Sequence, residues 1–160
     1  MSSQLDDMYR EVILDHFRSP RGRKPLDKAN ILTDGTNPAC GDQISMSAQI
    51  EDGILKDVHV DCKGCAISIA SGSILAESVR GRPYREVLKL AEQVKKMLKG
   101  EGDPVLPEEW EDIEALKGVR NFPVRVKCAL LAWVALIEGL KGYQPGKSVG
   151  KATVSTEQDN

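Results

Sequence analysis

Aromatic side chains and an excess of either charge are both scarce in this sequence. Phe, Trp and Tyr make up only 4% of the 160 residues, so a core must be built mainly from Leu, Ile, Val and Ala. The formal net charge is −2, whereas proteins that bind nucleic acid or anionic membranes normally carry a basic excess. We therefore expect no nucleic acid and no membrane among the partners.

Long hydrophobic runs are also missing. The longest nearly apolar run, from Cys128 to Ile137, is too short to span a bilayer. The first residues, MSSQLDDMYR, contain neither the basic nor the apolar region of a signal peptide. These absences predict a cytoplasmic protein, in which the four cysteines suggest thiol chemistry or metal binding before disulfides.

The length and composition of the chain suit one soluble domain. Hydrophobic residues make up 41% and charged residues 29%, which is typical of a globular rather than a disordered protein. We predict a single domain over residues 1–142. Residues 143–160 are polar and contain glycine, which predicts a frayed C-terminal tail.

One part of the chain has the period of β-strands. Residues 43–50 alternate strictly between apolar and polar side chains, as a half-buried strand does. Asp52-Gly53 is a hairpin-turn signal, and residues 54–62 form the expected return strand. A third, shorter strand is expected over residues 31–33. Together these segments predict an antiparallel meander with one face in solvent.

Helical periodicity dominates elsewhere. Apolar residues at helical spacing predict amphipathic helices over residues 5–17 and 84–98. Residues 66–79 indicate a helix whose many small side chains allow close packing on the sheet. The last helix, over residues 124–140, is apolar nearly all round and is expected at the centre of the core. A short helix is expected over residues 108–116.

Three cysteines and one aspartate lie on segments that can converge. Cys40 and Asp42 flank a glycine in a turn, and glycine frees the backbone to aim both side chains at one point. Cys65 starts the small-residue helix, where backbone N–H groups favour a thiolate, and Cys128 lies early in the last helix. Together they would form the soft tetrahedral site that zinc accepts. The alternatives are buried apolar cysteines and a turn-stabilising role for Asp42.

The fourth thiol belongs to a C-x-x-C sequence, Cys62 to Cys65. This spacing is typical of redox motifs and of half a zinc knuckle. However, a second C-x-x-C is missing from the sequence, and so is the βαβ context of thioredoxins. Cys62 also shares a strand face with Val58 and Val60. We interpret Cys62 as a near-site or core thiol rather than a primary ligand.

The two histidines are interpreted as ordinary surface or capping residues. His16 closes the first helix, where a C-terminal histidine suits the helix dipole, and His59 falls on the polar face of a strand. The basic loop over residues 18–28 is interpreted as a solvated stretch, with docking of an acidic partner as the alternative.

Four ordered motifs resemble those of one protein family. They are Tyr9 with Asp15-His16 and Pro20-Arg21; Asn37-Pro38-Ala39-Cys40-Gly41-Asp42; Gly64-Cys65-Ala66-Ile67-Ser68; and Asp112 to Leu116, followed by Phe122-Pro123 and Arg125-Val126-Lys127-Cys128-Ala129. Over residues 8–143 the chain resembles the IscU/NifU N-terminal family of Fe–S cluster assembly proteins, and within it the SufU branch. The resemblance implies an α+β fold with a small antiparallel three-stranded sheet packed by helices. It also implies that the three cysteines cluster at one exposed end.

The same resemblance implies a site and a reaction. Cys40, Asp42, Cys65 and Cys128 would be the metal ligands, and the usual metal in the SufU branch is zinc (Zn2+). The protein would accept sulfur from a PLP-dependent cysteine desulfurase and pass it toward downstream Fe–S assembly proteins. In the scaffold branch, the same pocket holds a nascent [2Fe–2S] cluster.

Three features favour the SufU branch over the scaffold branch. Scaffold proteins have a histidine directly before the third cysteine, whereas this chain has Lys127, which is no soft ligand while protonated. They also carry a Leu-Pro-Pro-Val-Lys motif, which this sequence lacks, and residues 100–118 resemble the insertion typical of SufU. Cys62 stands outside the family's ligand set and could compete for metal or resolve a persulfide.

The leading hypothesis is a zinc-dependent sulfur acceptor, or sulfurtransferase, that activates a desulfurase rather than a stand-alone enzyme. Cys40 would be the catalytic, sulfur-carrying nucleophile, because it lies on the turn and can leave the metal most easily. Arg125 would steer the incoming thiolate or pair with Asp42. The alternatives are a transient [2Fe–2S] scaffold, a purely structural zinc-binding adaptor, and a thiol-disulfide oxidoreductase that uses Cys62 and Cys65.

Overall fold

The fold combines a mostly antiparallel sheet with helices packed on one of its faces. The computed structural model describes residues 3–146 and 151–157 of the chain. The strands are β1 Ile31–Asn37, β2 Asp42–Glu51, β3 Ile54–Lys63, β4 Arg82–Pro83 and β5 Lys151–Ser155. The helices are α1 Ser3–Arg18, α2 Ala66–Val79, α3 Tyr84–Leu98, α4 Glu111–Glu114 and α5 Pro123–Gly142, with 3-10 turns η1 Glu108–Trp110 and η2 Ala115–Asn121. The α+β class inferred from the sequence is confirmed.

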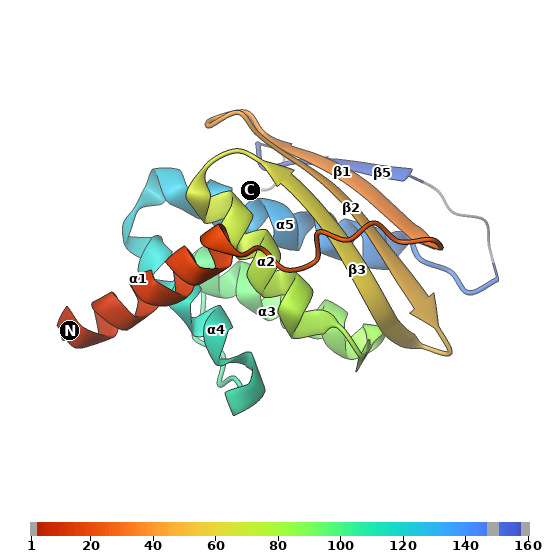
Figure 1. Cartoon of the computed structure of the whole chain (residues 1–160), viewed down its shortest axis with the longest axis horizontal. Coiled ribbons are helices and arrows are strands. Elements are labelled where there is room, and N and C mark those ends of the chain that lie inside the picture. The colour runs from red at the N-terminus through yellow and green to blue at the C-terminus, as the bar shows by residue number, and fades with distance from the viewer. Residues whose placement is uncertain (1–2, 147–150, 158–160) are drawn as a thin grey trace.

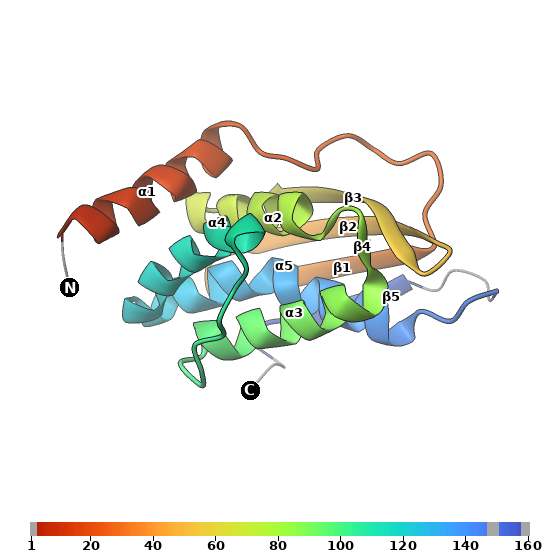
Figure 2. The ribbon, with the colours of Figure 1, turned by 90° about the horizontal axis from the view of Figure 1, so that it is seen from below.

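The elements lie in layers. In the described residues, the strands form one sheet in the order β4-β3-β2-β1-β5. Helices α2 and α5 lie against this sheet, and α3 packs on the outer side of α5 (Figures 1 and 2). The turn between β1 and β2, the start of α2 and the start of α5 all lie at one end of the sheet (Figure 1). This end is where the sequence-predicted site residues meet.

The predicted meander is confirmed. β2 pairs antiparallel with both β1 and β3. Asp52 and Gly53 turn the chain between β2 and β3 with φ values of 55° and 77°, the left-handed conformation that two-residue hairpin turns require. β1 extends beyond the predicted residues 31–33 as far as Asn37, because its second half pairs through the backbone although its polar sequence has no apolar alternation.

The sheet has more strands than the three predicted. β4 is a two-residue pairing with the start of β3. β5 lies parallel to β1 at the opposite edge, with Leu32 opposite Lys151 and Thr36 opposite Ser155. Both additions are edge strands held by backbone pairing, which needs no apolar pattern in the sequence, and this explains why the prediction missed them.

The C-terminal tail is affected by this finding. The frayed conformation predicted after residue 142 is wrong for β5, which is built into the sheet. Residues 147–150 and 158–160 of the predicted tail lie outside the described residues. The division into a domain over residues 1–142 and a tail over residues 143–160 stays a prediction.

Helix α5 lies at the centre of the core, as the sequence predicted. Its Trp133 is fully buried, and the indole N–H donates to Ser71 Oγ on α2 at 3.0 Å. Gly139 lies so close to β1 that an added Cβ would sit 2.6 Å from Ile31 Cγ2. The small side chains of α2 and α5 therefore let both helices approach the sheet closely.

Instead of one short helix over residues 108–116, the segment after α3 holds η1, α4 and η2.

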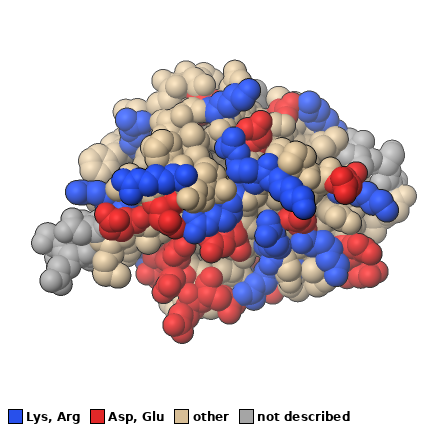
Figure 3. Space-filling view, viewed as in Figure 1, with Lys and Arg blue, Asp and Glu red and all other residues tan. Residues whose placement is uncertain are grey.

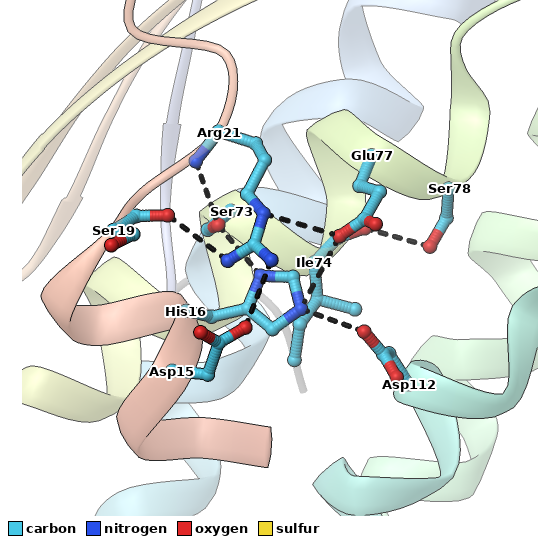
Figure 4. Close-up of polar contacts among 9 residues, drawn as sticks. All are labelled: Asp15, His16, Ser19, Arg21, Ser73, Ile74, Glu77, Ser78 and Asp112. Carbon is cyan, nitrogen blue, oxygen red and sulfur yellow. Dashed lines mark hydrogen bonds and ion pairs between the residues drawn. The ribbon is translucent and has the colours of Figure 1, made fainter.

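His16 is buried in a polar cluster that joins α1, α2 and α4 (Figure 4). Its Nδ1 lies 2.7 Å from Ser73 Oγ, and its Nε2 lies 2.8 Å from Asp112 Oδ2. Ser73 Oγ also accepts the backbone N–H of Arg21, so this hydroxyl joins the loop after α1 to His16. The surface interpretation of His16 is wrong, because the side chain is fully buried. Its partners are 57 and 96 residues away in the chain, so the local sequence carries no signal of this burial.

We expect His16→Ala to lower the free energy of unfolding by about 2–4 kcal/mol, because a buried side chain is lost and the Ser73 hydroxyl loses a buried hydrogen-bond partner. His59→Ala is the matched control on β3, where the side chain is partly exposed, and should change this free energy by less than about 0.5 kcal/mol. Urea unfolding of both variants beside the parent chain measures the difference. Equal losses in the two variants would contradict the structural role of His16.

Charges on the surface are largely mixed. Basic and acidic side chains are interspersed over the face in Figure 3, and acidic residues gather over η1 and α4. In the basic loop after α1, Arg21 lies 2.8 Å from Asp15 and Arg23 lies 3.6 Å from Asp61. Two cations of this loop are therefore paired within the chain. No helix in the described residues is long and apolar enough to cross a membrane.

Candidate metal centre

The turn between β1 and β2 presents Cys40 to solvent. Its loop closes through the backbone N–H groups of Cys40 and Gly41, which donate to the carbonyl oxygen of Asn37 at 3.2 and 2.9 Å. Gly41 has a φ of 75°, a left-handed conformation that most other residues adopt only with strain. The Cys40 side chain is exposed, whereas Asp42, which begins β2, is only 1% exposed. One turn therefore supplies an accessible thiol beside a buried carboxylate.

Asp42 is tied to the start of α2. Its Oδ1 accepts the backbone N–H of Cys65 at 2.9 Å, one of the N–H groups that a helix start leaves without a partner. Gly64 makes this approach possible, because a Cβ at this position would collide with the Asp42 carboxylate. The thiol of Cys65 is partly buried and lies 3.8 Å from Ser68 Oγ. The carboxylate thus fixes the position of the helix start that carries the second thiol.

Cys128 completes the cluster from α5. Its Sγ lies 3.5 Å from Cys40 Sγ, and the side chain is fully buried. The ligating atoms of Cys40, Asp42 and Cys128 all lie within 4.8 Å of one another. Cys65 stands beside this set and makes its closest contact to Asp42 through its backbone. The structure thus brings together the four residues predicted as ligands, three of them at ligating distance, while their role in metal binding stays a prediction.

The electrostatics of the cluster favour a cation. Burial raises the pKa of the Cys128 thiol far above its usual value, and hydrogen bonds to the neighbouring Cys65, Cys40 and Asp42 raise it further. The negative charge that Cys65 and Cys128 carry when ionised, together with their hydrogen bonds, raises the pKa of the Arg125 guanidinium. Thiols and a carboxylate crowded in a buried place repel one another when ionised. A soft divalent cation removes this repulsion, and sulfur and carboxylate donors at these separations suit zinc.

Cys62 lies in the hydrophobic core beneath the cluster. It is 4% exposed, and burial is the main cause that raises the pKa of its thiol, against a lowering hydrogen bond to Ser68. The nearby charges of Asp42 and Cys65 raise this pKa further. These neighbours place Cys62 next to the site, although it is absent from the group of atoms at ligating distance. This arrangement agrees with the interpretation of a near-site thiol.

Asn37 is a site residue whose role sequence reasoning missed. Its Nδ2 donates to Asp42 Oδ2 at 3.0 Å and to Cys128 Sγ at 3.5 Å, and its side chain is fully buried. The only available signal was its place at the start of the turn sequence that carries Cys40 and Asp42. Its position opposite Asp42 in the β1–β2 register explains why the amide reaches the carboxylate.

A second group of potential ligands lies at the cluster around His16. The ligating atoms of His16, Glu77 and Asp112 also lie within 4.8 Å of one another. However, the Arg21 guanidinium lies 3.5 Å from Glu77 Oε2, and His16 Nε2 is already hydrogen-bonded to Asp112 Oδ2. Because Arg21 brings a positive charge and Nε2 already has a partner, we interpret this group as polar contacts that join the helices rather than as a metal site.

The fold and the cluster together define a class: small α+β proteins that carry a cysteine–aspartate site at one end of an antiparallel sheet. The chain belongs to the family of the NifU-like N terminal domain, whose model matches residues 8–129. It is therefore a member of the SufU/IscU group of iron–sulfur cluster assembly proteins.

Relatives of both branches are similar to the chain. It is 36% identical over 146 residues to the zinc-dependent sulfurtransferase SufU of Bacillus subtilis, covering 91% of this chain and 97% of that one. It is 38% identical over 134 residues to the iron–sulfur cluster assembly scaffold protein IscU of Thermotoga maritima, covering 84% and 93%. A solved putative scaffold protein for the SUF system from Fervidobacterium islandicum has a TM-score of 0.74 at 28% identity, covering 87% of this chain and 99% of that one.

Proposed function

We propose that this protein is a zinc-dependent sulfur acceptor that takes sulfur from the persulfide of a PLP-dependent cysteine desulfurase. One observation carries the proposal: an exposed thiol, Cys40, lies 3.5 Å from the buried thiol of Cys128. A purely structural zinc site would be expected to bury all its ligands, whereas this site leaves one at the surface on a turn. The similarity to a zinc-dependent sulfurtransferase supports the same function.

The residues that would hold the metal are Cys40, Asp42, Cys65 and Cys128. When bound, zinc keeps cysteine ligands as thiolates and protects them from oxidation until a partner arrives. The protein's contribution is the placement of these donors. Asp42 is held by the Cys65 N–H and the Asn37 amide, and Cys128 is fixed in the rigid helix α5. Cys40 lies on the exposed turn between β1 and β2, so it can move without disturbing a strand or a helix.

The transfer step moves one sulfur atom between two cysteines. The Cys40 thiolate attacks the outer sulfur of the desulfurase persulfide, and a new S–S bond forms on Cys40. The S–S bond of the desulfurase breaks, and its electron pair leaves with the desulfurase cysteine as a thiolate. The outer sulfur is transferred to Cys40 together with its hydrogen. One thiolate and one persulfide are present before and after the step, so there is no net oxidation or reduction. The exposed Arg125 beside the thiols stabilises negative charge during this exchange.

The second candidate function is a transient scaffold that carries a [2Fe–2S] cluster as cargo, and similarity to IscU proteins favours it. The residue before Cys128 weighs against it. Lys127 Nζ lies 2.8 Å from Glu157 Oε1 in an exposed ion pair, so its amine already has an acidic partner. Downstream Fe–S assembly proteins would receive sulfur from the acceptor, or the finished cluster from the scaffold.

Desulfurase turnover with and without this protein, measured beside its zinc content, tests the proposal. We expect one zinc per chain by native mass spectrometry and a faster release of alanine from cysteine when the protein is present. The matched control is the same protein stripped of metal by a chelator. Full acceptor activity without metal would contradict the zinc requirement, and zinc without stimulation would indicate a structural adaptor. A brown protein with charge-transfer bands after anaerobic purification would indicate the scaffold.

A further inference from the structure

The C-terminal strand brings a buried threonine to the candidate metal centre. β5 runs parallel to β1 toward the end of the sheet that holds the cysteines (Figure 1). The two strands lie close, since a Cβ added to Gly35 would sit 2.9 Å from Val154 Cγ2. Directly after β5, the backbone N–H of Thr156 donates to the carbonyl oxygen of Thr36 at 3.1 Å. The pairing thereby places the Thr156 side chain opposite the last residue of β1.

A chain of buried hydrogen bonds runs from Thr156 to the cluster. Thr156 Oγ1 lies 2.9 Å from Asn37 Oδ1, and Asn37 Nδ2 reaches Asp42 Oδ2 at 3.0 Å and Cys128 Sγ at 3.5 Å. Thr156, Asn37 and Asp42 are 2%, 0% and 1% exposed. Because these three side chains are shielded from water, each of them depends on its neighbour in the network for a hydrogen-bond partner.

Elementary chemistry sets the direction of each bond. The Asn37 amide turns its NH2 group to Asp42 Oδ2 and Cys128 Sγ, to which Nδ2 donates, because only the nitrogen of an amide is a donor. Its oxygen then faces Thr156, whose hydroxyl is the donor. If this donor were lost, the amide oxygen would be buried without a partner, and the amide could gain one only by turning away from the carboxylate. Thr156 therefore fixes the orientation in which Asn37 serves the site.

A second contact holds the same segment in place. Glu157 Oε1 lies 2.8 Å from Lys127 Nζ, so the residue after Thr156 is paired with the residue before Cys128. The segment from β5 to Glu157 is thus tied to β1 and to α5, the two elements that carry the turn with Cys40 and the thiol of Cys128.

We propose that Thr156 is a positioning residue of the metal centre, acting through Asn37 on Asp42 and Cys128. This role rests on the function proposed above. The hydroxyl of Thr156 holds the Asn37 amide so that its NH2 group stabilises the Asp42 carboxylate and the Cys128 thiolate as metal ligands. Residues that orient ligands in this way commonly change metal affinity by about 10–100-fold when they are lost.

Two threonines on the same segment provide a matched pair for the test. Thr156→Val removes the buried hydroxyl and keeps the shape of the side chain. Thr153→Val makes the same change on β5 at an exposed position. Thr156→Ser restores the hydroxyl without the methyl group. The full-length variants are loaded with cobalt(II), whose absorption bands report ligand geometry, and with zinc, whose transfer to a chromogenic chelator reports the stability of the site.

We expect Thr156→Val to weaken the thiolate-to-cobalt charge-transfer band and to speed zinc transfer about 10-fold. Thr156→Ser and Thr153→Val should stay within about twofold of the parent chain, since both keep the hydroxyl at position 156. An unchanged Thr156→Val would overturn the proposal, as would a Thr156→Ser or Thr153→Val variant that changes as much. If Thr156→Val fails to fold, Thr156→Ala takes its place in the same comparison.

The design separates this inference from the proposed function. A parent chain that binds neither zinc nor cobalt would remove the proposed metal centre itself, whatever the variants do. A parent chain that binds both metals, with no difference between Thr156→Val and Thr153→Val, would leave the metal centre intact and remove only the role of Thr156.

Discussion

Replacing Cys40 with serine is expected to abolish sulfur uptake from the desulfurase persulfide and the stimulation of the desulfurase. Cys40 is the exposed thiol of the cluster, and a serine hydroxyl is neither ionised nor nucleophilic enough at neutral pH to replace it. The loss should be on the order of 1,000-fold or more, as when a catalytic nucleophile is removed. Incubation with desulfurase and cysteine, followed by peptide mass spectrometry of the alkylated persulfide, measures the uptake.

Cys62→Ser is the matched control for this prediction. Cys62 is buried in the core, and this burial raises the pKa of its thiol. A smaller fraction of Cys62 is therefore ionised and able to attack a persulfide. This variant should keep most of the uptake and most of the stimulation. A persulfide found on Cys62, together with an inactive Cys62→Ser protein, would show that Cys62 rather than Cys40 carries the sulfur.

A second large effect is expected from Gly64→Ala. The added Cβ would collide with the Asp42 carboxylate, so either the carboxylate or the start of α2 must move. Both movements break the hydrogen bond between Asp42 Oδ1 and the Cys65 N–H. Because two predicted ligands are displaced at once, we expect zinc affinity to fall by about 100-fold, the upper end of the range for residues that orient metal ligands.

Gly53→Ala separates this collision from backbone strain. Gly53 also has a positive φ, at 77°, but an added Cβ there meets no atom within 4 Å. It should lower the free energy of unfolding by about 1 kcal/mol and leave zinc affinity unchanged. Competition with a chelator of known affinity measures the metal, and urea unfolding measures stability. If Gly64→Ala bound zinc as tightly as Gly53→Ala does, Gly64 would not be needed to position Asp42.

The sequence by itself determined the fold class and the residues at the centre of the site. The strict alternation over residues 43–50 produced β2, because a strand with one buried face must place apolar side chains at every second position. The Asp52-Gly53 turn could be predicted because it depends on local backbone conformation. The central place of α5 could be predicted from its apolar composition alone. Cys40, Asp42, Cys65 and Cys128 could be selected from motif order, and the structure brings them to one end of the sheet.

Only the tertiary structure decided how polar groups are used. His16, Asn37 and Thr156 looked like ordinary surface, turn and tail residues, yet each is nearly or fully buried. Their partners lie 57, 91 and 119 residues away in the chain, so no local pattern could reveal them. β5 escaped prediction for a related reason: an edge strand is held by backbone hydrogen bonds, which every sequence can form. A buried polar side chain or an added edge strand is determined by what the fold places opposite it, and that is known only when the chain is folded.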